Sequence, residues 1–202
     1  MKTHSSPILD EKLKEHVIIQ YLSKFTTISE EEAHILLENL DVRSFKKGDI
    51  LLREGQISPW SYFVLKGCVR QYYLVDGEEK TTNFFTEGTP ISLYEGFYKN
   101  APAKYYLVCL EDCYLSVGLP EDASHPLATK FEPVCRLASQ EESSKYQEML
   151  AMYMIHNPEE RYLNLLQTRP DLIERVPQYY LASYLGITPE TLSRIRKRIM
   201  SK

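Results

Sequence analysis

Apolar residues follow a helical period at the start of the chain. Between residues 8 and 25 they recur every four positions, at Leu9, Leu13, Val17 and Tyr21. This spacing places side chains on one face of an α-helix. A second helix is predicted after Ser29, because Ser29 with Glu32 three residues later forms a capping box. The first forty residues are therefore predicted to be helical.

The pattern changes to short alternating segments between Val42 and Gly118. Glycines separate these segments at positions 48, 55, 67, 77 and 88. Four strands are predicted in the later part of this region, at residues 68–75, 79–85, 105–110 and 114–118. The first two form a hairpin around the Asp76-Gly77 turn. Short strands with regularly spaced turns favour an antiparallel sandwich or roll.

Helical periodicity returns after Pro120. Residues 125–131 are predicted to form a short helix and residues 133–156 a long one, which contains a polar run at residues 140–145. Asn157-Pro158 ends the long helix, and residues 159–168 form another. A long helix that follows a sheet region could be a spine or a dimer seam.

Residues 178–199 predict a helix-turn-helix. Leu181–Leu185 form a short helix, and Gly186 is the residue best suited to end it in a left-handed conformation. Thr188 and Pro189 then restart a helix as its N-cap and first residue. Two helices joined by a three-residue turn follow from these positions.

The second of these helices has an apolar and a polar face. At about 100° per residue, one arc carries Leu192, Ile195 and Ile199. The opposite arc carries Glu190, Ser193, Arg194 and Lys197. A helix fits the DNA major groove, where Arg donates two hydrogen bonds to guanine and Glu accepts one from cytosine. Base readout is therefore assigned to Glu190, Ser193 and Arg194.

Contacts to DNA phosphates are expected beside this face. The candidate residues are Thr188, Thr191, Arg196, Lys197 and Arg198. Phosphate contacts position a protein on the duplex without specifying sequence. The competing interpretation is an ordinary helical hairpin with a charged outer face.

The charge distribution favours an anion-binding C-terminal region. The formal net charge is −4, but residues 1–158 carry 16 Lys and Arg against 23 Asp and Glu, whereas residues 159–202 carry 8 against 5. A basic end on an acidic body points first to nucleic acid. A solvated, charged helix end is the alternative.

Cysteine and histidine usage argues against an enzyme. The four cysteines, at 68, 109, 113 and 135, form no C-x-x-C pair, and each is expected to be a buried small side chain. The five histidines all lie outside residues 42–118. A metal-dependent β-roll enzyme would lack ligands there, and a Ser or Cys nucleophile would lack a histidine base. We expect no catalytic residues and no metal.

No membrane segment is expected from the hydropathy pattern. The longest apolar run, Met149–Ile155, spans seven residues, whereas a membrane span needs about twenty. Residues 1–7 contain no signal-peptide core. The sequence therefore predicts a cytoplasmic protein without a membrane partner.

Two patches of the sequence resemble the Crp/Fnr transcription regulators. Residues 189–195, Pro-Glu-Thr-Leu-Ser-Arg-Ile, are similar to the recognition helix of the Fnr-like branch. Residues 45–55, which read F-x-x-G-D-x-L-x-x-E-G, are similar to the cyclic-nucleotide-binding β-roll, as are residues 62–70 and 76–79. With the connecting helix, the resemblance covers residues 20–200.

The resemblance implies an α+β fold in four segments. These are N-terminal helices at 1–41, an antiparallel, jelly-roll-like β-roll sensor domain at 42–120, a connecting dimerisation helix at 121–157 and a helix-turn-helix domain at 158–202. Family members pair through the long helix, so a homodimer is expected with its seam near Leu137, Ser144, Ala151 and Ile155. RNA polymerase is a candidate further partner.

The sequence departs from the cyclic-nucleotide-binding pattern at the phosphate cassette. That cassette begins with Gly-Glu and ends with an Arg that neutralises the phosphate, whereas residues 88–105 have neither the Glu after Gly88 nor the Arg. A desolvated phosphate without a partner is costly, so cyclic AMP is not expected and the effector is unknown. The candidate pocket residues are Tyr72, Tyr94, Lys104 and Tyr105, and the simpler interpretation, that they are core or surface aromatics, is favoured over a role in a pocket.

Two further family features are missing from the sequence. No cysteine precedes Cys68, so an iron-sulfur cluster has no N-terminal ligand set. The chain stops soon after the predicted recognition helix, so contacts from a C-terminal β-wing are not expected.

The predicted function is a dimeric, sequence-specific DNA-binding regulator of the Crp/Fnr type. It would bind a palindromic duplex operator with a G·C pair in each half-site, and an unknown small effector in the β-roll would gate it. No cofactor is expected. The alternative is a ligand-sensing or protein-interaction β-roll that does not bind DNA.

Overall fold

The computed structural model describes residues 15–93, 96, 99–118 and 127–200. The N-terminal part contains a π-helical turn, η1 (Glu15–Ile19), and two α-helices, α2 (Gln20–Ser23) and α3 (Glu30–Glu38). The predicted capping box is confirmed at α3. The Ser29 hydroxyl accepts from the Glu32 N–H at 3.2 Å, and the Glu32 carboxylate accepts from the Ser29 N–H at 2.9 Å. The first residues of the helix predicted from residue 8 lie outside the described chain.

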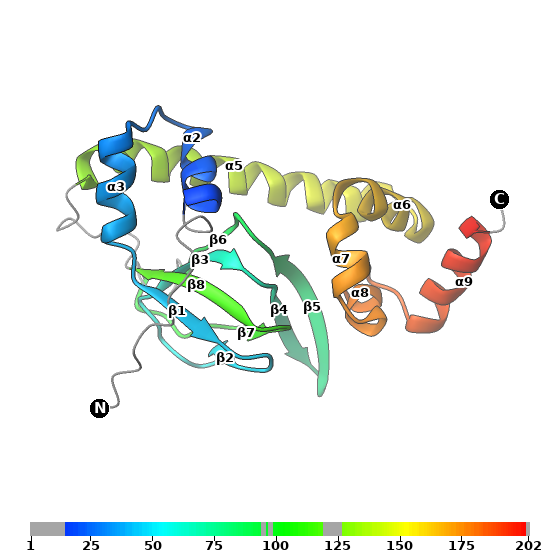
Figure 1. Cartoon of the computed structure of the whole chain (residues 1–202). Helices are drawn as coiled ribbons and strands as arrows, with labels where there is room; N and C mark the ends of the chain where they lie inside the picture. The colour runs from blue at the N-terminus through cyan, green and yellow to red at the C-terminus, as the bar shows by residue number, and fades with distance from the viewer. Residues whose placement is uncertain (1–14, 94–95, 97–98, 119–126, 201–202) are drawn as a thin grey trace. The chain divides into compact units, whose positions relative to one another are not determined.

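Two four-stranded sheets follow in the described region (Figure 1). Their strands are β1 (Val42–Phe45), β2 (Ile50–Leu52), β3 (Ser61–Lys66), β4 (Val69–Val75), β5 (Glu78–Phe85), β6 (Pro90–Ile91), β7 (Tyr106–Cys109) and β8 (Cys113–Gly118). The strand orders are β1-β8-β3-β6 and β2-β7-β4-β5. β8 pairs antiparallel with both β1 and β3, and β2 pairs antiparallel with β7. The predicted antiparallel β-roll is confirmed.

The turn between β4 and β5 is the one that the sequence predicted. Asp76 and Gly77 have φ angles of 53° and 81°, so both residues are left-handed. Asp is among the few side chains that tolerate this region, and Gly enters it without steric cost. The local sequence therefore fixes this hairpin.

Alternating burial builds the core of the roll. Along β8, Cys113, Leu115 and Val117 are buried and the residues between them are partly exposed. Val64, Val69 and Leu107 belong to the same apolar cluster. A second cluster joins the N-terminal helices to the roll through Ile18, Leu36, Val42 and Leu65. Each fully buried aliphatic side chain contributes about 1.5–3 kcal/mol.

A single long helix, α5 (Ala128–Ile155), replaces the two helices predicted at 125–131 and 133–156. The boundary predicted at Pro133 is wrong, because Pro133 lies inside the helix. A proline removes one backbone hydrogen bond, and the long segment that follows it supplies enough of its own to continue the helix. Residues 125 and 126 lie outside the described chain.

The C-terminal region is helical. It contains α6 (Pro158–Thr168), α7 (Pro170–Arg175), α8 (Gln178–Tyr184) and α9 (Pro189–Met200). Asn157 caps α6, and its side chain accepts from the N–H groups of Glu159 and Glu160 at 3.0 and 3.1 Å. The predicted break at Asn157-Pro158 is therefore confirmed. α7 has only six residues and was not predicted.

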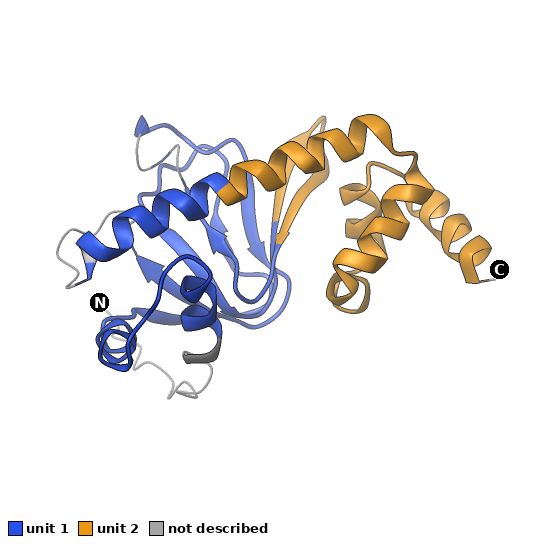
Figure 2. Cartoon of the chain, turned by 90° about the horizontal axis from the view of Figure 1, so that it is seen from above, with its two compact units in different colours: residues 1–70, 85–140 blue, residues 71–84, 141–202 orange. Residues whose placement is uncertain are grey.

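The chain divides into two compact units (Figure 2). One unit comprises residues 1–70 and 85–140, and the other comprises residues 71–84 and 141–202. The β4–β5 hairpin is thus grouped with the C-terminal helices. The colour change within α5 in Figure 2 marks the other boundary.

The expectation that every cysteine is buried holds for three of the four. Cys68, Cys109 and Cys113 are buried, but Cys135 is exposed. The neighbouring Val134 takes the buried position on α5. Successive helical residues are about 100° apart, so Cys135 lies toward solvent.

Candidate nucleic-acid interface

The turn between α8 and α9 is closed by backbone hydrogen bonds. The Gly186 N–H donates to the Ser183 carbonyl at 3.0 Å, and the Ile187 N–H donates to the Ala182 carbonyl at 3.0 Å. Gly186 has a φ of 69°. This pair of bonds with a left-handed glycine is the Schellman motif, which ends a helix and redirects the chain.

α9 begins at the predicted N-cap. The Thr188 hydroxyl accepts from the Thr191 N–H at 3.3 Å, and the two threonine hydroxyls lie 3.2 Å apart. Pro189 is the first helical residue, where its missing N–H costs no hydrogen bond. Thr188 and Thr191, both predicted phosphate contacts, thus also fix the start of the helix.

The apolar face of α9 packs in the helical core. Leu192 and Ile195 are buried, as the helical period predicted, and Ile199 is half-buried. Leu181 and Ala182 on α8, and Leu185 at its C-cap, are all buried to about the same degree as Leu192. α8 and α9 therefore pack closely through one apolar face each, with a small side chain, Ala182, between them.

The three predicted readout residues lie outside that packing. Glu190 and Arg194 are exposed, and Ser193 is half-buried. Hydrogen bonds from the Glu190 N–H and the Thr188 hydroxyl lower the pKa of the Glu190 carboxyl, and the positive charge of Arg194 lowers it further. α9 therefore carries a carboxylate and a guanidinium one helical turn apart.

The predicted phosphate-binding cations differ in their surroundings. Lys197 is exposed in the last turn of α9, and Arg196 is half-buried. Arg198 forms an ion pair with Glu159 at the start of α6. This contact joins residues 39 positions apart, and the sequence pattern did not predict it.

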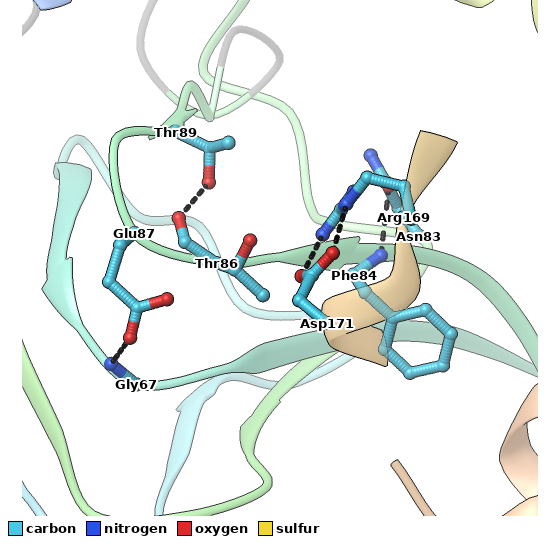
Figure 3. A network of polar contacts seen from close by, with 8 residues as sticks. All are labelled: Gly67, Asn83, Phe84, Thr86, Glu87, Thr89, Arg169 and Asp171. Carbon is cyan, nitrogen blue, oxygen red and sulfur yellow. Dashed lines mark hydrogen bonds and ion pairs between the residues drawn. The ribbon is translucent and has the colours of Figure 1, made fainter. Parts of the chain in front are cut away.

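α7 supplies apolar residues to the same helical core. Leu172 is buried within α7 and Val176 directly after it. Arg169 pairs with Asp171 at 3.2 Å where the helix begins (Figure 3). Pro170 at the first helical position was the one local signal that could have identified this helix.

Ser183 on α8 is bonded to the backbone of β5. Its hydroxyl accepts from the Thr81 N–H at 2.9 Å and donates to the Glu79 carbonyl at 3.2 Å. The rings of Phe84 and Tyr184 meet edge to face with centroids 5.3 Å apart. These partners lie about a hundred positions apart in the sequence, so no local pattern could predict them.

The candidate effector residues are spread over different environments. A small cavity of about 10 Å³ is lined by Leu52, Gln56, Ser58, Leu93, Gly96, Ala101, Ala103 and Tyr105. Tyr105 is the predicted residue that reaches it. Tyr72 is buried in β4, Lys104 is exposed, and Tyr94 lies outside the described residues.

The backbone where the cassette-like segment begins is held by short polar contacts (Figure 3). The Thr89 hydroxyl donates to the Thr86 carbonyl at 2.6 Å. The Glu87 carboxylate accepts from the Gly67 N–H at 2.8 Å. Glu87 stands one residue before Gly88, and it bonds to the β3–β4 turn. A glutamate at this position therefore supports the roll itself.

The predicted seam residues share one exposed arc of α5. Leu137, Ser144, Ala151 and Ile155 are all exposed. At about 100° per residue they fall within about 40° of one another. Val134, which is buried, lies on a different arc. The seam residues therefore do not take part in the core of the chain.

Within the described residues, no helix combines the length and apolar character needed to cross a membrane. The same part of the chain holds no group of three or more His, Cys, Asp or Glu arranged to bind a metal ion.

The comparison with protein families matches the roll. Residues 42–123 match the cyclic nucleotide-binding domain family. No curated protein matches the sequence.

Several solved structures have similar folds. FixK2 from Bradyrhizobium japonicum is 18% identical with a TM-score of 0.66, over 80% of this chain and 85% of that one. A CooA variant from Carboxydothermus hydrogenoformans is 17% identical with a TM-score of 0.65, over 92% and 84%. TTHA1359, a transcriptional regulator of the CRP/FNR family from Thermus thermophilus, is 22% identical with a TM-score of 0.58, over 80% and 86%.

Together these findings define the fold of the protein. Residues 42–123 match the cyclic nucleotide-binding domain family, and the described part of the chain has a Crp/Fnr-like α+β fold. The resemblance noted in the sequence is therefore confirmed at the level of the fold.

Proposed function

We propose that this protein is a dimeric transcription regulator that reads a palindromic DNA operator through α9. The main support is the construction of that helix. Leu192 and Ile195 anchor it, Thr188 caps it, and Glu190 and Arg194 remain exposed on its outer side. A capped, firmly packed helix with an exposed polar face meets the requirements for major-groove recognition.

Each readout residue has a distinct role. Arg194 donates two hydrogen bonds to guanine O6 and N7, and Glu190 accepts from the cytosine amino group of the same or an adjacent pair. The hydrogen bond from its own backbone N–H is the largest of the contacts that lower the pKa of the Glu190 carboxyl, so they favour its ionised, accepting form. Ser193 contacts a neighbouring base edge. The operator therefore contains a G·C pair in each half-site.

Phosphate contacts come from Thr188, Thr191, Arg196, Lys197 and Arg198. The ion pair with Glu159 orients Arg198. Because an exposed ion pair is worth only about 0–1 kcal/mol, a DNA phosphate can share or replace this carboxylate. These contacts contribute to affinity and to its salt dependence without contributing to specificity.

The dimer forms through α5, along Leu137, Ser144, Ala151 and Ile155. Ile155 is 76% exposed in the chain, so its apolar side chain is available to the same helix of a second copy. Light scattering should give twice the chain mass of 23.6 kDa. Ile155→Glu should give a monomer, whereas the control Ile57→Glu, at an exposed apolar position in the β2–β3 loop, should stay dimeric. A wild-type chain that is monomeric both with and without DNA would contradict the proposed dimer seam on α5.

The roll is proposed to sense a small effector of unknown identity, other than a cyclic nucleotide. None of the described residues that line its cavity is cationic.

The segment boundaries at residues 41, 120 and 157 remain part of the proposal. RNA polymerase is the proposed further partner of the DNA-bound dimer.

Selection of bound duplexes from a random-sequence DNA library tests the proposal. The wild-type chain should enrich palindromes whose half-sites are one helical turn apart, about 34–36 Å, with a G·C pair in each. The Arg194→Ala chain is the control and should lose that G·C preference. Enrichment of no sequence by the wild-type chain would contradict DNA readout and favour a β-roll that binds only ligand or protein.

A further inference from the structure

Arg161 lies where the long helix α5 ends and α6 begins. It is the fourth residue of α6, and its side chain is half-buried. Its Nη1 donates a hydrogen bond of 3.0 Å to the carbonyl of His156, the residue directly after α5. The guanidinium group also lies over the ring of Tyr153, in the last turn of α5, with 5.1 Å between the guanidinium carbon and the ring centroid. Arg161 therefore joins α6 to the end of α5.

The contact between Arg161 and Tyr153 is a partly desolvated cation–π stack. Arg161 Nε is buried and has no hydrogen-bond partner among the described residues. Burial raises the pKa of the Tyr153 hydroxyl, so the ring is neutral at physiological pH. The attraction therefore comes from the face of the ring, and it is stronger where the cation is shielded from water. A planar guanidinium suits this position, because it stacks and donates a hydrogen bond in one fixed geometry, which a lysine ammonium does not.

The turn between α8 and α9 lies against this stack. A Cβ at Gly186 would lie 3.8 Å from Tyr153 Cε1 and 3.9 Å from Arg161 Nη2, which are ordinary contact distances. Two residues before Gly186, the Tyr184 hydroxyl donates to Met149 Sδ on α5 at 3.7 Å. All of these residues belong to the same compact unit. The stack therefore contacts α5, α6 and the turn of the helix-turn-helix.

We propose that Arg161 is a positioning residue, whose stack on Tyr153 fixes the direction of α9 relative to α5 and thereby the half-site spacing that the dimer reads. This role rests on the proposed function, in which each chain of the dimer presents one recognition helix. Only Ile187 and Thr188 separate Gly186 from the first residue of α9. A contact that holds Gly186 therefore also holds the start of that helix. Arg161 acts through the position of α9 and not by contacting a base.

Half-site spacing depends on the direction of α9 because a twofold axis relates the two chains of a dimer. A rotation of α9 relative to the dimer helix moves both recognition helices, so the distance between them changes. A firm stack selects duplexes with one spacing, about 34–36 Å. A loosened stack leaves the base contacts of each α9 intact but allows several spacings. The preference for a spacing and the preference for a base are therefore separable.

The first test measures the position of α9 without DNA. Spin labels are attached after Ser143→Cys on α5 and Lys197→Cys on α9, both at exposed positions. The chain also carries Cys135→Ser, and the other three cysteines are buried. Labelled chain is diluted with an excess of unlabelled chain. Pulsed electron paramagnetic resonance then reports the distance between the two labels within one chain.

The wild-type background should give a single narrow distance distribution, because the stack holds the α8–α9 turn against α5. Arg161→Ala and Arg161→Lys should both broaden it. Tyr153→Phe keeps the ring face and should stay narrow, as should the control Arg136→Ala at an exposed position of α5. Thermal melts verify that each variant is folded. Distributions as narrow in both Arg161 variants as in the wild-type background would overturn the proposal, and so would a broad distribution in the wild-type background.

The second test varies the number of base pairs between the two half-sites of the selected palindrome. Wild-type protein should prefer one spacing. Arg161→Lys should weaken this preference by about 2- to 30-fold, the range that the energy of one cation–π contact allows, and should keep the preference for the G·C pair. Equal loss of both preferences would overturn the positioning role. If wild-type protein selects no palindrome, the proposed function fails, and the distance measurement still decides whether Arg161 positions α9.

Discussion

Apolar burial has different consequences in the helix-turn-helix and in the β-roll. In the helical region, buried Leu192 and Ile195 fix a helix whose Glu190 and Arg194 remain in solvent. In the roll, buried side chains fill the interior and leave a cavity of about 10 Å³, roughly the space of one water. Small-molecule sites usually need about 300–1,000 Å³.

The difference shows which kind of site each region can supply. A groove-reading helix needs only a rigid frame and correctly placed surface groups, and the helical region has both. A nucleotide pocket needs volume together with a phosphate partner inside it. Lys104, the cation in the cassette-like segment, is exposed. The proposed readout therefore rests on surface chemistry that is already in place.

Truncation of a buried leucine should have the largest effect on stability. Its effect on DNA binding should differ between the helical region and the roll. Leu192→Ala in α9 and Leu107→Ala in β7 each remove a fully buried leucine, so each should cost about 2–5 kcal/mol of unfolding free energy. Denaturant titration measures this cost. Under conditions where both variants are folded, Leu192→Ala should bind DNA more weakly, whereas Leu107→Ala should bind like the wild type. Equal loss of DNA binding in the two variants would contradict the claim that the helical region, and not the roll, reads DNA.

Arg194→Ala should cost about 1–3 kcal/mol per half-site on the operator and relax the preference at one base pair. Arg198→Ala is the matched control on the same helix. It should weaken binding to all sequences alike and reduce the salt slope by about one. Each variant is measured on operator and scrambled duplexes at two salt concentrations. Equal losses for Arg194→Ala on both duplexes would mean that Arg194 contacts only phosphate.

Gly186→Ala should destabilise the helical region by about 1–2 kcal/mol, because a side chain at a φ of 69° is strained. A Cβ there would meet only ordinary contacts, at 3.8 Å or more, so the cost is conformational rather than steric. Gly118→Ala in the roll, where φ is not left-handed and a Cβ has open space, is the control with little expected change. Similar melting temperatures for Gly186→Ala and the wild type would argue against the strained turn.

Cyclic AMP and cyclic GMP should produce no binding heat in calorimetry. The cassette lacks its arginine, and the described cavity residues bring no cation to a phosphate. Micromolar affinity for either nucleotide would show that the roll opens a pocket and would reverse the comparison between the two regions. The control is a cyclic-nucleotide-binding protein measured in the same buffer.

Local signals account for what the sequence predicted correctly. Ser29 with Glu32, Asp76 with Gly77, and Gly186 with Thr188 each specify backbone geometry within a few residues, so their helix caps and turns were predictable. The polar and apolar faces of α9 follow from the helical period alone. These features fix the caps and turns, and they place Glu190 and Arg194, two of the three proposed readout residues, at the surface.

The errors come from effects that a local pattern does not contain. Pro133 was read as a helix start, but the helix on both sides of it is continuous. Cys135 differs from the other cysteines only by its place on α5. The Arg198–Glu159 pair and the Ser183 bonds to β5 join positions far apart in the chain.

The most direct test of sequence-specific readout is the ratio of affinities for the selected palindrome and its scrambled duplex. Both are titrated with wild-type protein at physiological salt, and the stoichiometry is determined on the palindrome. The account predicts two chains per palindrome and binding at least about 10³-fold tighter than to the scrambled duplex. Equal affinity for the two duplexes would contradict readout by α9.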